Sequence, residues 1–443
     1  MPRDALVVKM LDAAGITEGD LIDASLRGRA LTGVLMPHSD FSDSKTLVLK
    51  LDSGYNVGVT VDDAAVLRLK ERRAAKHYAG EAAAPPEAAG GRPGFLALIG
   101  TGGTIASYVD YETGAVQPAL TTRELATAVP EVAARHLLKP IALFSEFSEN
   151  LRPEHWVRIA REVKRQVEEG ATGVLIPHGT DTLAFTAAAL AFMIESPPVP
   201  IVIVGSQRSS DRPSSDASFN LLCAAKVASS DIAEVVAVMH DRTGDERCAV
   251  HLGVRVRKMH ASARSAFRSI NTTPLAFTDG QTLTIEKGAR FRSRSGGRKV
   301  VLHEKLAEPV ALLQHYPGFP VSLLKTALAD CKGVVIAGTG LGHVSEDMIA
   351  LIERACATGY PVVMTTQCLY GRTGLNVYST GRKLVQAGVI DGGDTLPETA
   401  YVKLMWAVAH AERPHDIRKL MQRNLAGELS DRRTFEGSGE DER

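Results

Sequence analysis

From residue 95 onward, short runs of apolar residues alternate with longer segments in which apolar residues recur every three or four positions. The short runs are bounded by glycine, proline or polar residues, so they predict buried strands. The clearest predicted strands are residues 95–99, 171–176, 200–204, 233–239, 333–337 and 361–364. The clearest predicted helices are residues 156–169, 183–194, 217–228, 345–358 and 399–411. This alternation predicts a mostly parallel sheet with helices on both faces.

The first 75 residues carry a different pattern, in which short β-like segments follow one another. Residues 30–36, 45–51 and 55–61 predict three strands, joined by a polar loop and by a tight turn at Asp52-Ser-Gly54. A three-stranded meander needs further strands or closure to be stable alone. We therefore expect residues 1–75 to form a small all-β barrel module. Such a module could bind nucleic acid or protein, or act only as a spacer, because a fold does not determine a function.

Composition marks the expected domain boundaries. Residues 76–93 are rich in alanine, proline and glycine, which bury too little surface to order a segment, so they predict a flexible linker. A polar insert at residues 292–298 lies near the expected boundary between a lobe at residues 94–304 and a second lobe at residues 305–425. The charged residues 426–443 are expected to be a disordered tail. The predicted fold class is α/β, with a two-lobed parallel-sheet core after a small β module.

The charge balance argues against a chain that binds nucleic acid unaided, and the cysteine pattern argues against a disulfide-bonded protein. The 443 residues include 51 basic and 51 acidic side chains, whereas a chain that binds nucleic acid unaided is expected to carry a basic excess. The five cysteines form no CxxC pair, which is typical of a reducing compartment. The sequence shows no signal-peptide pattern and no apolar run near the ~20 residues of a membrane span. We expect a cytoplasmic protein with no membrane partner.

Polar side chains follow three of the predicted strands. The first group is Thr101-Gly-Gly-Thr104, in which adjacent glycines let the backbone turn tightly and approach a ligand. The second is His178-Gly-Thr-Asp-Thr182, and the third is Gly205-Ser-Gln-Arg208. The carboxyl ends of parallel strands meet at one edge of a sheet, where such folds bind ligands. We therefore expect these groups to converge.

The residue types in these groups favour nucleophilic chemistry. A threonine hydroxyl is a poor nucleophile at neutral pH and needs a base that is itself oriented by a partner. Thr180, Asp181 and Lys258 could form that group. A lysine acts as a base only where burial or nearby cations lower its pKa, and Arg255 and Arg257 are the neighbouring cations. Taken singly, Asp181 could instead cap a helix, and Lys258 could lie on a solvated basic face.

Two motifs taken together carry a resemblance to a known family. The segments Ile99-Gly-Thr-Gly-Gly-Thr-Ile-Ala106 and His178-Gly-Thr-Asp-Thr182 look like the two signature motifs of the bacterial-type L-asparaginase/glutaminase family. Their occurrence together and in this order is specific, although neither is specific alone. The resemblance covers residues 95–425 and implies a two-lobed asparaginase-like core.

The resemblance also implies roles for the matched residues. Thr104 corresponds to the threonine nucleophile of the family. Ser148 and Glu149 fall where the family binds the α-carboxylate and α-amino group of its amino-acid substrate. A second group, which activates the nucleophile or the hydrolytic water, is matched by Thr180, Asp181 and Lys258.

Other segments are similar to a particular branch of that family. Residues 108–116, 337–343 and 366–382, together with the N-terminal module, resemble the archaeal glutamyl-tRNA(Gln) amidotransferase D subunits. The resemblance implies a subunit that releases ammonia from glutamine or asparagine. It implies a partner, the E subunit of the amidotransferase, that binds Glu-tRNA(Gln) and uses ATP and Mg²⁺ to activate the glutamate. It further implies a homodimer of this chain within a heterotetramer.

The residues themselves agree with this division of labour. The sequence holds no P-loop, and Gly338-Thr-Gly-Leu-Gly-His343 fails the dinucleotide fingerprint because His343 occupies the last glycine position. No pair of histidines or cysteines has a spacing typical of metal ligands. We therefore expect no cofactor in this chain. Two alternatives stay open: a free-standing asparaginase/glutaminase with an accessory domain, and a non-catalytic binding protein on the same scaffold.

Overall fold

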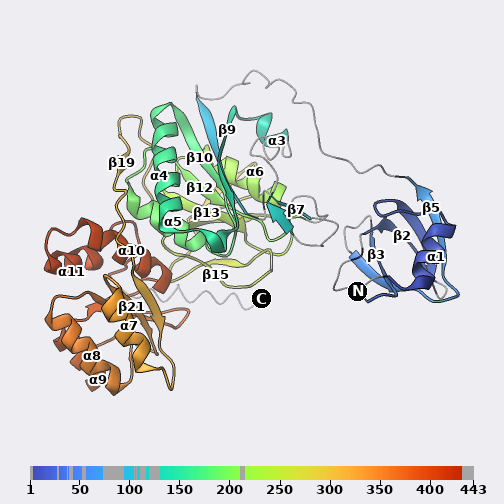
Figure 1. Cartoon of the computed structure of the whole chain (residues 1–443). Helices are drawn as coiled ribbons and strands as arrows, with labels where there is room; N and C mark the ends of the chain where they lie inside the picture. Colours follow the sequence, from blue (N-terminus) through green and yellow to red (C-terminus); the bar gives the residue numbers. More distant parts are fainter. Residues whose placement is uncertain are drawn as a thin grey trace.

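A computed structural model of the chain (Figure 1) describes most of the predicted elements. The described residues are 3–26, 29–36, 38, 43–51, 56–72, 94–103, 105, 107–109, 116–118, 130–209 and 215–431. The predicted linker at residues 76–93 lies outside them, as do residues 432–443 of the predicted tail. The α/β fold class is confirmed, because the described core consists of two sheets with helices packed on them.

The N-terminal module, blue in Figure 1, contains one antiparallel sheet. Its strands are β1 (Leu21–Leu26), β2 (Arg29–Leu35), β3 (Thr46–Lys50), β4 (Asn56–Thr60) and β5 (Val66–Glu71). They pair in the order β4-β3-β2-β1-β5. The sequence pattern predicted β2, β3 and β4, and the two additional strands supply the pairing that a three-stranded meander lacks.

A helix that the sequence pattern did not predict packs on this sheet. Helix α1 (Ala5–Ala13) begins after Asp4, whose side chain accepts a hydrogen bond from the Leu6 amide at 2.9 Å. Val7 and Leu11 lie four residues apart on one face of the helix and are buried in the core of the module. The module is therefore not purely β, which corrects the prediction.

The first lobe of the core is built on an eight-stranded sheet. Its strands are β6 (Phe95–Gly102), β9 (Leu138–Glu146), β10 (Ala171–Pro177), β12 (Ile201–Val204), β13 (Val235–His240), β14 (Cys248–Leu252), β17 (Ala276–Thr278) and β18 (Leu283–Ile285). The order is β18-β17-β14-β13-β12-β10-β6-β9. Strands β13 to β9 run parallel, and β14, β17 and β18 add an antiparallel edge.

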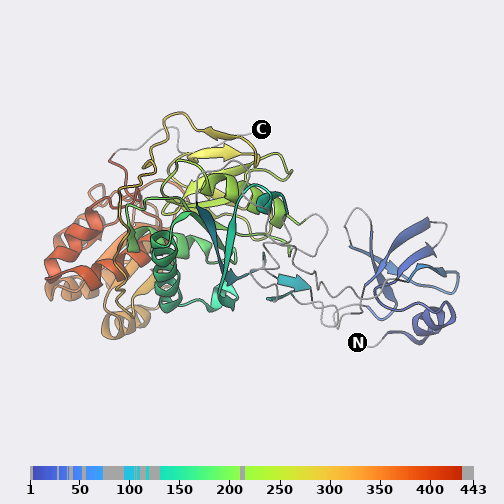
Figure 2. The same ribbon diagram turned by 90° about the horizontal axis from the view of Figure 1, so that it is seen from above.

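Helices cover both faces of this sheet (Figures 1 and 2). Helices α4 (Pro153–Glu168) and α5 (Leu183–Met193) lie on one face, and α6 (Ala217–Ala228) lies on the other. Ala97 and Ile99 of β6 face α4 and α5, whereas the alternate residues Leu96 and Leu98 face α6. Burial on both faces explains why β6 is a continuous apolar run.

Short ribbons and short helices complete the described part of this lobe. The ribbons pair β7 (Ser107–Val109) with β8 (Val116–Pro118), β11 (Ile194–Glu195) with β19 (Val301–Leu302), and β15 (Val256–Lys258) with β16 (Phe267–Ser269). The short helices are α3 (Pro130–Ala133) and the 3₁₀ turn η2 (Ser148–Asn150). Elements of two to four residues carry no periodicity, so the sequence pattern did not predict them, although β15 and η2 hold predicted site residues.

The second lobe, orange to red in Figure 1, has a four-stranded parallel sheet. Its strands, in spatial order, are β20 (Ala311–Gln314), β21 (Val334–Gly338), β22 (Val362–Thr366) and β23 (Ile390–Asp391). Its helices are α7 (Val321–Asp330), α8 (Glu346–Ala357), α9 (Ser379–Ala387), α10 (Pro397–His410) and α11 (Pro414–Gln422). No helix in the described part of the chain has the length and apolar character needed to cross a membrane.

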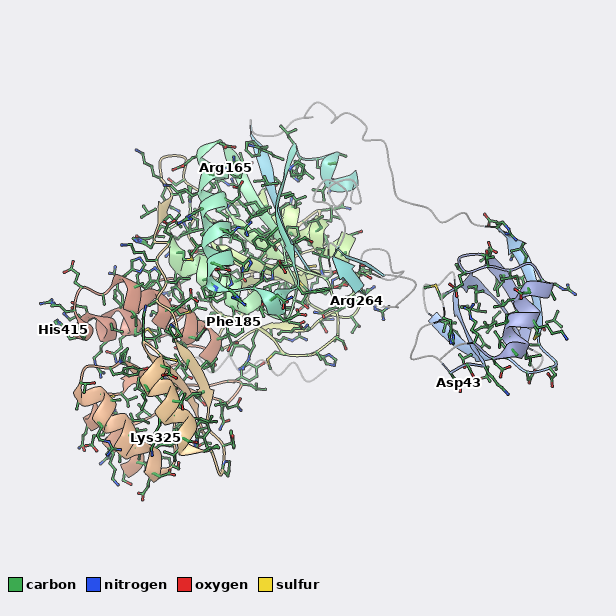
Figure 3. The ribbon with its side chains drawn as sticks, in the orientation of Figure 1. Asp43, Arg165, Phe185, Arg264, Lys325 and His415 are labelled. Carbon is green, nitrogen blue, oxygen red and sulfur yellow. The ribbon has the colours of Figure 1, made fainter. Side chains whose placement is uncertain are left out.

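Helix α10 joins the two lobes. It packs on β21 and β22 of its own lobe and on α5 of the first lobe. The rings of Phe185 (labelled in Figure 3) and Tyr401 meet edge to face across this contact, 6.1 Å apart. One apolar cluster therefore contains Leu190 of α5, Leu404 of α10 and Val335 of β21. Because the lobes share this core, a shift in the second lobe can reach the sheet of the first.

The segment after α11 is packed against the core, although residues 426–443 were predicted to be a disordered tail. Glu428 and Lys403 are both fully buried and form an ion pair of 2.5 Å. Glu428 also accepts hydrogen bonds from the amides of Leu425 and Ala426. The prediction is therefore wrong for residues 426–431. The charge count favoured a solvated tail, whereas a buried lysine on α10 compensates the charge.

Replacing Lys403 tests this attachment. We expect Lys403→Met to lower the free energy of unfolding by about 3–5 kcal/mol, because the Glu428 carboxylate stays buried without its counter-ion. Urea unfolding measures the change. Lys419→Met is the matched control, because Lys419 pairs with Asp416 on the surface and such pairs are worth about 0–1 kcal/mol. Equal losses in the two variants would contradict a buried, structural ion pair.

Candidate active site

The carboxyl ends of β6, β10 and β12 meet at one edge of the large sheet, as the sequence predicted. The Thr101 hydroxyl donates to the Pro177 carbonyl at 2.6 Å, and the His178 amide donates to the Val204 carbonyl at 2.8 Å. Gly103 has a φ of +82°, and a Cβ there would lie 2.2 Å from the Gly179 amide nitrogen. Only glycine allows this approach. The predicted nucleophile, Thr104, follows Gly103 and lies outside the described residues.

The second predicted group is assembled from two distant segments. The Lys258 ammonium donates to the Thr180 hydroxyl at 2.8 Å and to the Asp181 carboxylate at 2.6 Å. Thr180 is buried, and the Lys258 side chain is only 14% exposed, whereas the Asp181 side chain is 67% exposed. The lysine therefore lies at the border of the protein interior, and the exposed carboxylate holds it from the solvent side.

This geometry decides between the alternative interpretations of Asp181 and Lys258. Helix α5 starts at Leu183 with Thr182 at its N-cap, and the Asp181 side chain bonds to Lys258. The helix-cap interpretation of Asp181 is therefore wrong. A lysine that is mostly buried and bonded to Thr180 does not lie on a solvated basic face, so that interpretation is also wrong.

The two arginines beside Lys258 in the sequence each pair with a carboxylate. Arg255 bonds to Asp394, with a closest distance of 2.9 Å, and Arg257 lies 3.3 Å from a Glu398 oxygen. Both carboxylates belong to the second lobe. Each arginine is therefore paired with its own carboxylate, and the effect of these arginines on Lys258 stays a prediction.

The predicted substrate-binding residues lie on the 3₁₀ turn η2, beside the second motif. Ser148 is buried, and its carbonyl accepts a hydrogen bond from the Thr182 hydroxyl at 2.7 Å. A Cβ on Gly179 would lie 2.7 Å from the Ser148 Cβ, so the two backbones are in close contact. Glu149 is exposed. The turn thus presents one buried hydroxyl and one exposed carboxylate next to Thr180.

A buried chain of hydrogen bonds behind the second motif was missed by the sequence analysis. The His178 Nδ1 lies 2.6 Å from the Gly179 carbonyl, which can only accept, so Nδ1 carries the proton. The His178 Nε2 then accepts from the Thr186 hydroxyl at 2.9 Å, and the Thr186 oxygen accepts from the Trp156 indole at 3.0 Å. Burial lowers the pKa of His178 to about 4, although the Gly179 carbonyl opposes this. The neutral ring fixes the peptide that precedes Thr180.

A second missed network holds the loop that follows β12. The Asp216 carboxylate accepts from the amides of Gln207 at 3.0 Å and Arg208 at 3.1 Å, and from the Asn220 side chain at 3.1 Å. Asn220 in turn lies 2.6 Å from the His240 Nδ1 at the end of β13. An Asp and an Asn four residues apart at the start of a helix is the sequence signal that could have found this network.

The chemistry available at this edge is that of an ammonium ion next to a hydroxyl. Because the Lys258 ammonium is the donor in both of its hydrogen bonds, the Thr180 hydroxyl only accepts from it. The hydroxyl therefore keeps its own proton, which it can donate to a ligand. A cation 2.8 Å from that oxygen stabilises negative charge that develops there. The described residues contain no group of three or more His, Cys, Asp or Glu side chains that could hold a metal ion.

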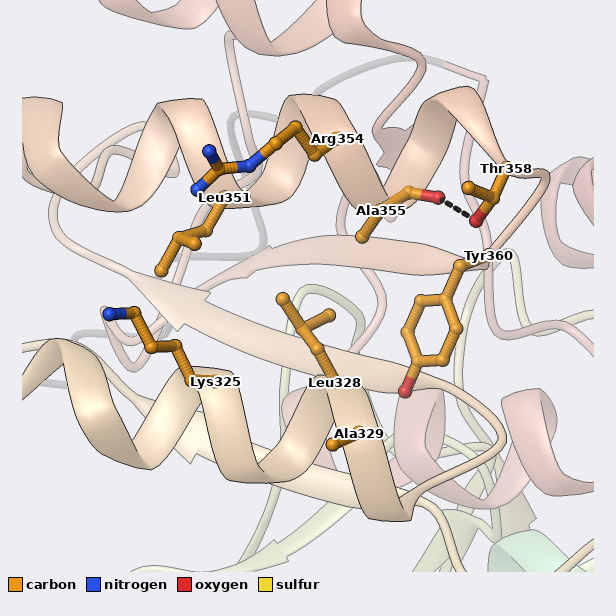
Figure 4. A pocket seen from close by; sticks show the side chains of 8 residues that line it. All are labelled: Lys325, Leu328, Ala329, Leu351, Arg354, Ala355, Thr358 and Tyr360. Atoms are coloured by element: carbon orange, nitrogen blue, oxygen red, sulfur yellow. Dashed lines mark hydrogen bonds between the residues drawn. The ribbon is translucent and has the colours of Figure 1, made fainter.

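A separate groove lies in the second lobe, between α7 and α8 (Figure 4). Its volume is about 320 Å³, and Lys325, Leu328, Arg354 and Tyr360 are among its lining residues. The Tyr360 hydroxyl donates to the Cys331 carbonyl at 2.9 Å. None of the predicted site residues lines this groove, so it is separate from the edge that holds Lys258.

Comparison with known families covers most of the chain. Residues 96–290 match the family described as asparaginase, N-terminal. Residues 309–421 match the glutaminase/asparaginase C-terminal domain, and residues 16–69 match the GatD N-terminal domain. The two asparaginase matches cover most of both lobes, and the first contains every predicted site residue.

Comparison with individual proteins adds relatives of nearly full length. The chain is 47% identical over 436 residues to the D subunit of the glutamyl-tRNA(Gln) amidotransferase of Pyrococcus abyssi, covering 96% of this chain and 97% of that one. It is 43% identical to the protein of the same name from Methanosphaera stadtmanae, covering 97% of both chains. Among solved structures, the thermostable L-asparaginase from Thermococcus kodakarensis has a TM-score of 0.68 at 33% identity, covering 76% of this chain and 99% of that chain.

The buried histidine predicts a specific dependence of stability on pH. The unfolded chain takes up a proton at His178 near its ordinary pKa of 6.5, whereas the folded chain does so only near pH 4. The folded state therefore loses stability as pH falls through this window, by about 3 kcal/mol for this group. Urea unfolding between pH 7 and pH 4 should show a shallower loss for His178→Asn than for the original protein. His415→Asn, at an exposed position, is the control, and a matching change in its slope would contradict the assignment.

Proposed function

This chain belongs to the family of glutamyl-tRNA(Gln) amidotransferase D subunits, and on that premise we propose how its site performs amide hydrolysis. The family membership makes the chain the amidohydrolase subunit of an enzyme that converts Glu-tRNA(Gln) to Gln-tRNA(Gln). The ammonia that this conversion needs comes from the side-chain amide of glutamine or asparagine. The hydrogen bonds of Lys258 with Thr180 and Asp181 are the observation that carries the proposed mechanism.

The proposed reaction has two steps at the edge of the large sheet. The hydroxyl oxygen of Thr104 attacks the amide carbon, and its proton passes through the group of Thr180, Asp181 and Lys258 to the leaving nitrogen. The C–N bond breaks and ammonia leaves, which forms an ester between Thr104 and the acyl group. Water then attacks the ester carbon, gives one proton back to the threonine oxygen and releases the free acid. Proton transfer of this kind is worth about 10²–10⁴ in rate.

The glycine-rich turn and the 3₁₀ turn have separate tasks in this proposal. Backbone N–H groups of the glycine-rich turn stabilise the oxyanion that develops on the amide oxygen, and losing one such donor costs about 10²–10³ in rate. Ser148 and Glu149 bind the α-carboxylate and the α-amino group of the substrate. The exposed Glu149 carboxylate and the α-amino group of the substrate carry opposite charges, which supports the assignment of Glu149 to that group.

The family membership also leads to a proposal about the partner of this chain. We propose that a partner, the E subunit of the amidotransferase, binds Glu-tRNA(Gln) and activates the glutamate with ATP and Mg²⁺, while this chain supplies ammonia. The zero net charge of the chain supports leaving the tRNA to a partner. The N-terminal module, which matches the GatD N-terminal domain, then serves to dock the partner.

We further propose that two copies of this chain form a homodimer within a heterotetramer. The loop between β22 and α9 exposes apolar side chains, with Leu369 at 50%, Val377 at 60% and Tyr378 at 58% exposure. Large exposed apolar side chains gathered in one loop support a protein interface there. A cytoplasmic location agrees with five cysteines that are all free thiols.

Substitution of the nucleophile and of the lysine tests the mechanism. We expect Thr104→Val, which keeps the volume and removes the hydroxyl, to abolish ammonia release from glutamine and asparagine. Lys258→Met should lower kcat by about 10²–10⁴, because the proton-transfer group loses its ammonium. A coupled assay of ammonia measures both. Near-normal activity in Thr104→Val would show that another residue is the nucleophile.

Addition of the partner tests the assembly. We expect a low rate of ammonia release by the chain alone. The rate should rise when the E partner protein, Glu-tRNA(Gln), ATP and Mg²⁺ are present, because ammonia can be transferred only to an activated glutamate. The control omits only the tRNA. A high rate that neither partner nor tRNA changes would favour a free-standing asparaginase with an accessory module. Failure to release ammonia under any condition would favour a non-catalytic binding protein.

A further inference from the structure

Strand β15 presents different residues on its two faces. Val256 and Lys258 share one face, on which Val256 is buried and Lys258 reaches Thr180. Arg255, directly before the strand, and Arg257 share the other face and contact carboxylates of the second lobe. Side chains of a strand alternate between its faces, so the same short segment connects the site to the second lobe. The Thr399 hydroxyl adds a bond to the Val254 carbonyl at 3.1 Å.

Arg255 is the more buried of the two arginines. Its side chain is 2% exposed, and it donates to the Asp394 carboxylate at 2.9 Å and to the Asp394 carbonyl at 3.2 Å. It also donates to the Gly427 carbonyl and to the Ser430 hydroxyl, both at 2.8 Å. The planar guanidinium thus bonds at once to the loop after β23 and to the segment after α11. A lysine ammonium could not reproduce this fixed set of directions.

The segment that reaches Arg255 is the one packed by the buried ion pair. We call residues 424–431 the C-terminal strap. Glu428 attaches the strap to Lys403 on α10, and the Ser430 amide donates to the Asp394 carboxylate at 2.9 Å. The match to the glutaminase/asparaginase C-terminal domain ends at residue 421. The strap therefore lies beyond the part of the chain that matches the asparaginase families.

We propose that Arg255 is a positioning residue through which the C-terminal strap holds β15 and thereby keeps the Lys258 ammonium at Thr180. The proposal rests on the catalytic role of Lys258 in the proposed function. Strand β15 pairs with the three residues of β16, and backbone bonds at Arg255 and Met259 extend this ribbon, but the ribbon is not part of either large sheet. The bonds from Arg255 to Asp394, Gly427 and Ser430 add a constraint on this ribbon from the other lobe.

The size of the expected effect follows from the sensitivity of catalysis to position. A displacement of about 1 Å in a catalytic group can cost about 10²-fold in rate. The proposed substrate-binding residues Ser148 and Glu149 lie on a different element, η2, whereas the Arg255 side chain bonds to the loop after β23 and to the strap. A loosened β15 should therefore lower kcat and leave KM nearly unchanged. A general loss of structure would not separate the two constants in this way.

The test is a double-mutant cycle on the full chain assayed with its partner protein. We expect Arg255→Lys to lower kcat for ammonia release by about 10–10²-fold, with KM changed by less than about threefold. On a Lys258→Met background, Arg255→Lys should have no further effect, because the lysine that it positions is absent. Arg418→Lys is the matched control, because Arg418 also donates to backbone carbonyls, those of Gly388 and Val389, within the second lobe.

Each outcome supports or overturns the proposal. An equal loss of kcat from Arg255→Lys on both backgrounds overturns it, and so does a loss of the same size in Arg418→Lys. Full activity of Lys258→Met overturns the catalytic role of the lysine, and the positioning role with it. If Arg255→Lys does not fold, Ser430→Ala, which removes one partner of the guanidinium, replaces it in the same cycle. An unchanged kcat in Ser430→Ala would then overturn the proposal.

Discussion

The hydrogen bond from Lys258 to Thr180 joins two segments that are 78 positions apart in the sequence, and the candidate site exists only where this bond can form. Thr180 follows the end of β10, so its place depends on the parallel order of the central strands. Lys258 lies on a short ribbon outside the large sheet. An ammonium that donates to a hydroxyl and to a carboxylate holds both oxygens in one place. Gly103 of the first turn lets its backbone approach Gly179, directly before Thr180.

The lobes are coupled by packing and by charge. Helix α10 is covered by α5 on one side and by the second sheet on the other, so one apolar cluster extends through both lobes. On this helix, Lys403 and Glu398 connect it to the C-terminal strap and to β15. Buried ion pairs add little net stability, but removing one partner is costly. The pair of Arg257 with Glu398 therefore joins the two lobes, and the pair of Lys403 with Glu428 fixes the strap to α10.

The family resemblance and the residue pattern explain different parts of the fold. Strands β6, β10, β12 and β13 were predictable because strands buried on both faces are continuous apolar runs. Helices α4, α5 and α6 were predictable from their length and apolar content. Helices α1, α7, α9 and α11 were missed, because each is only nine or ten residues long and a short helix shows its period over fewer than three turns. The role of Thr104 still rests on its motif.

The sequence by itself determined the α/β architecture, the three polar strand ends and the residues able to do amide chemistry, because these depend on local periodicity and on motifs. Only the tertiary structure decided which partners the charged groups take. It paired Arg255 with Asp394, and it neutralised His178 by burial. It also packed Glu428 inside a segment whose composition indicated a solvated tail. Burial and the choice of a counter-ion depend on residues far away in the sequence, so no local pattern could reveal them.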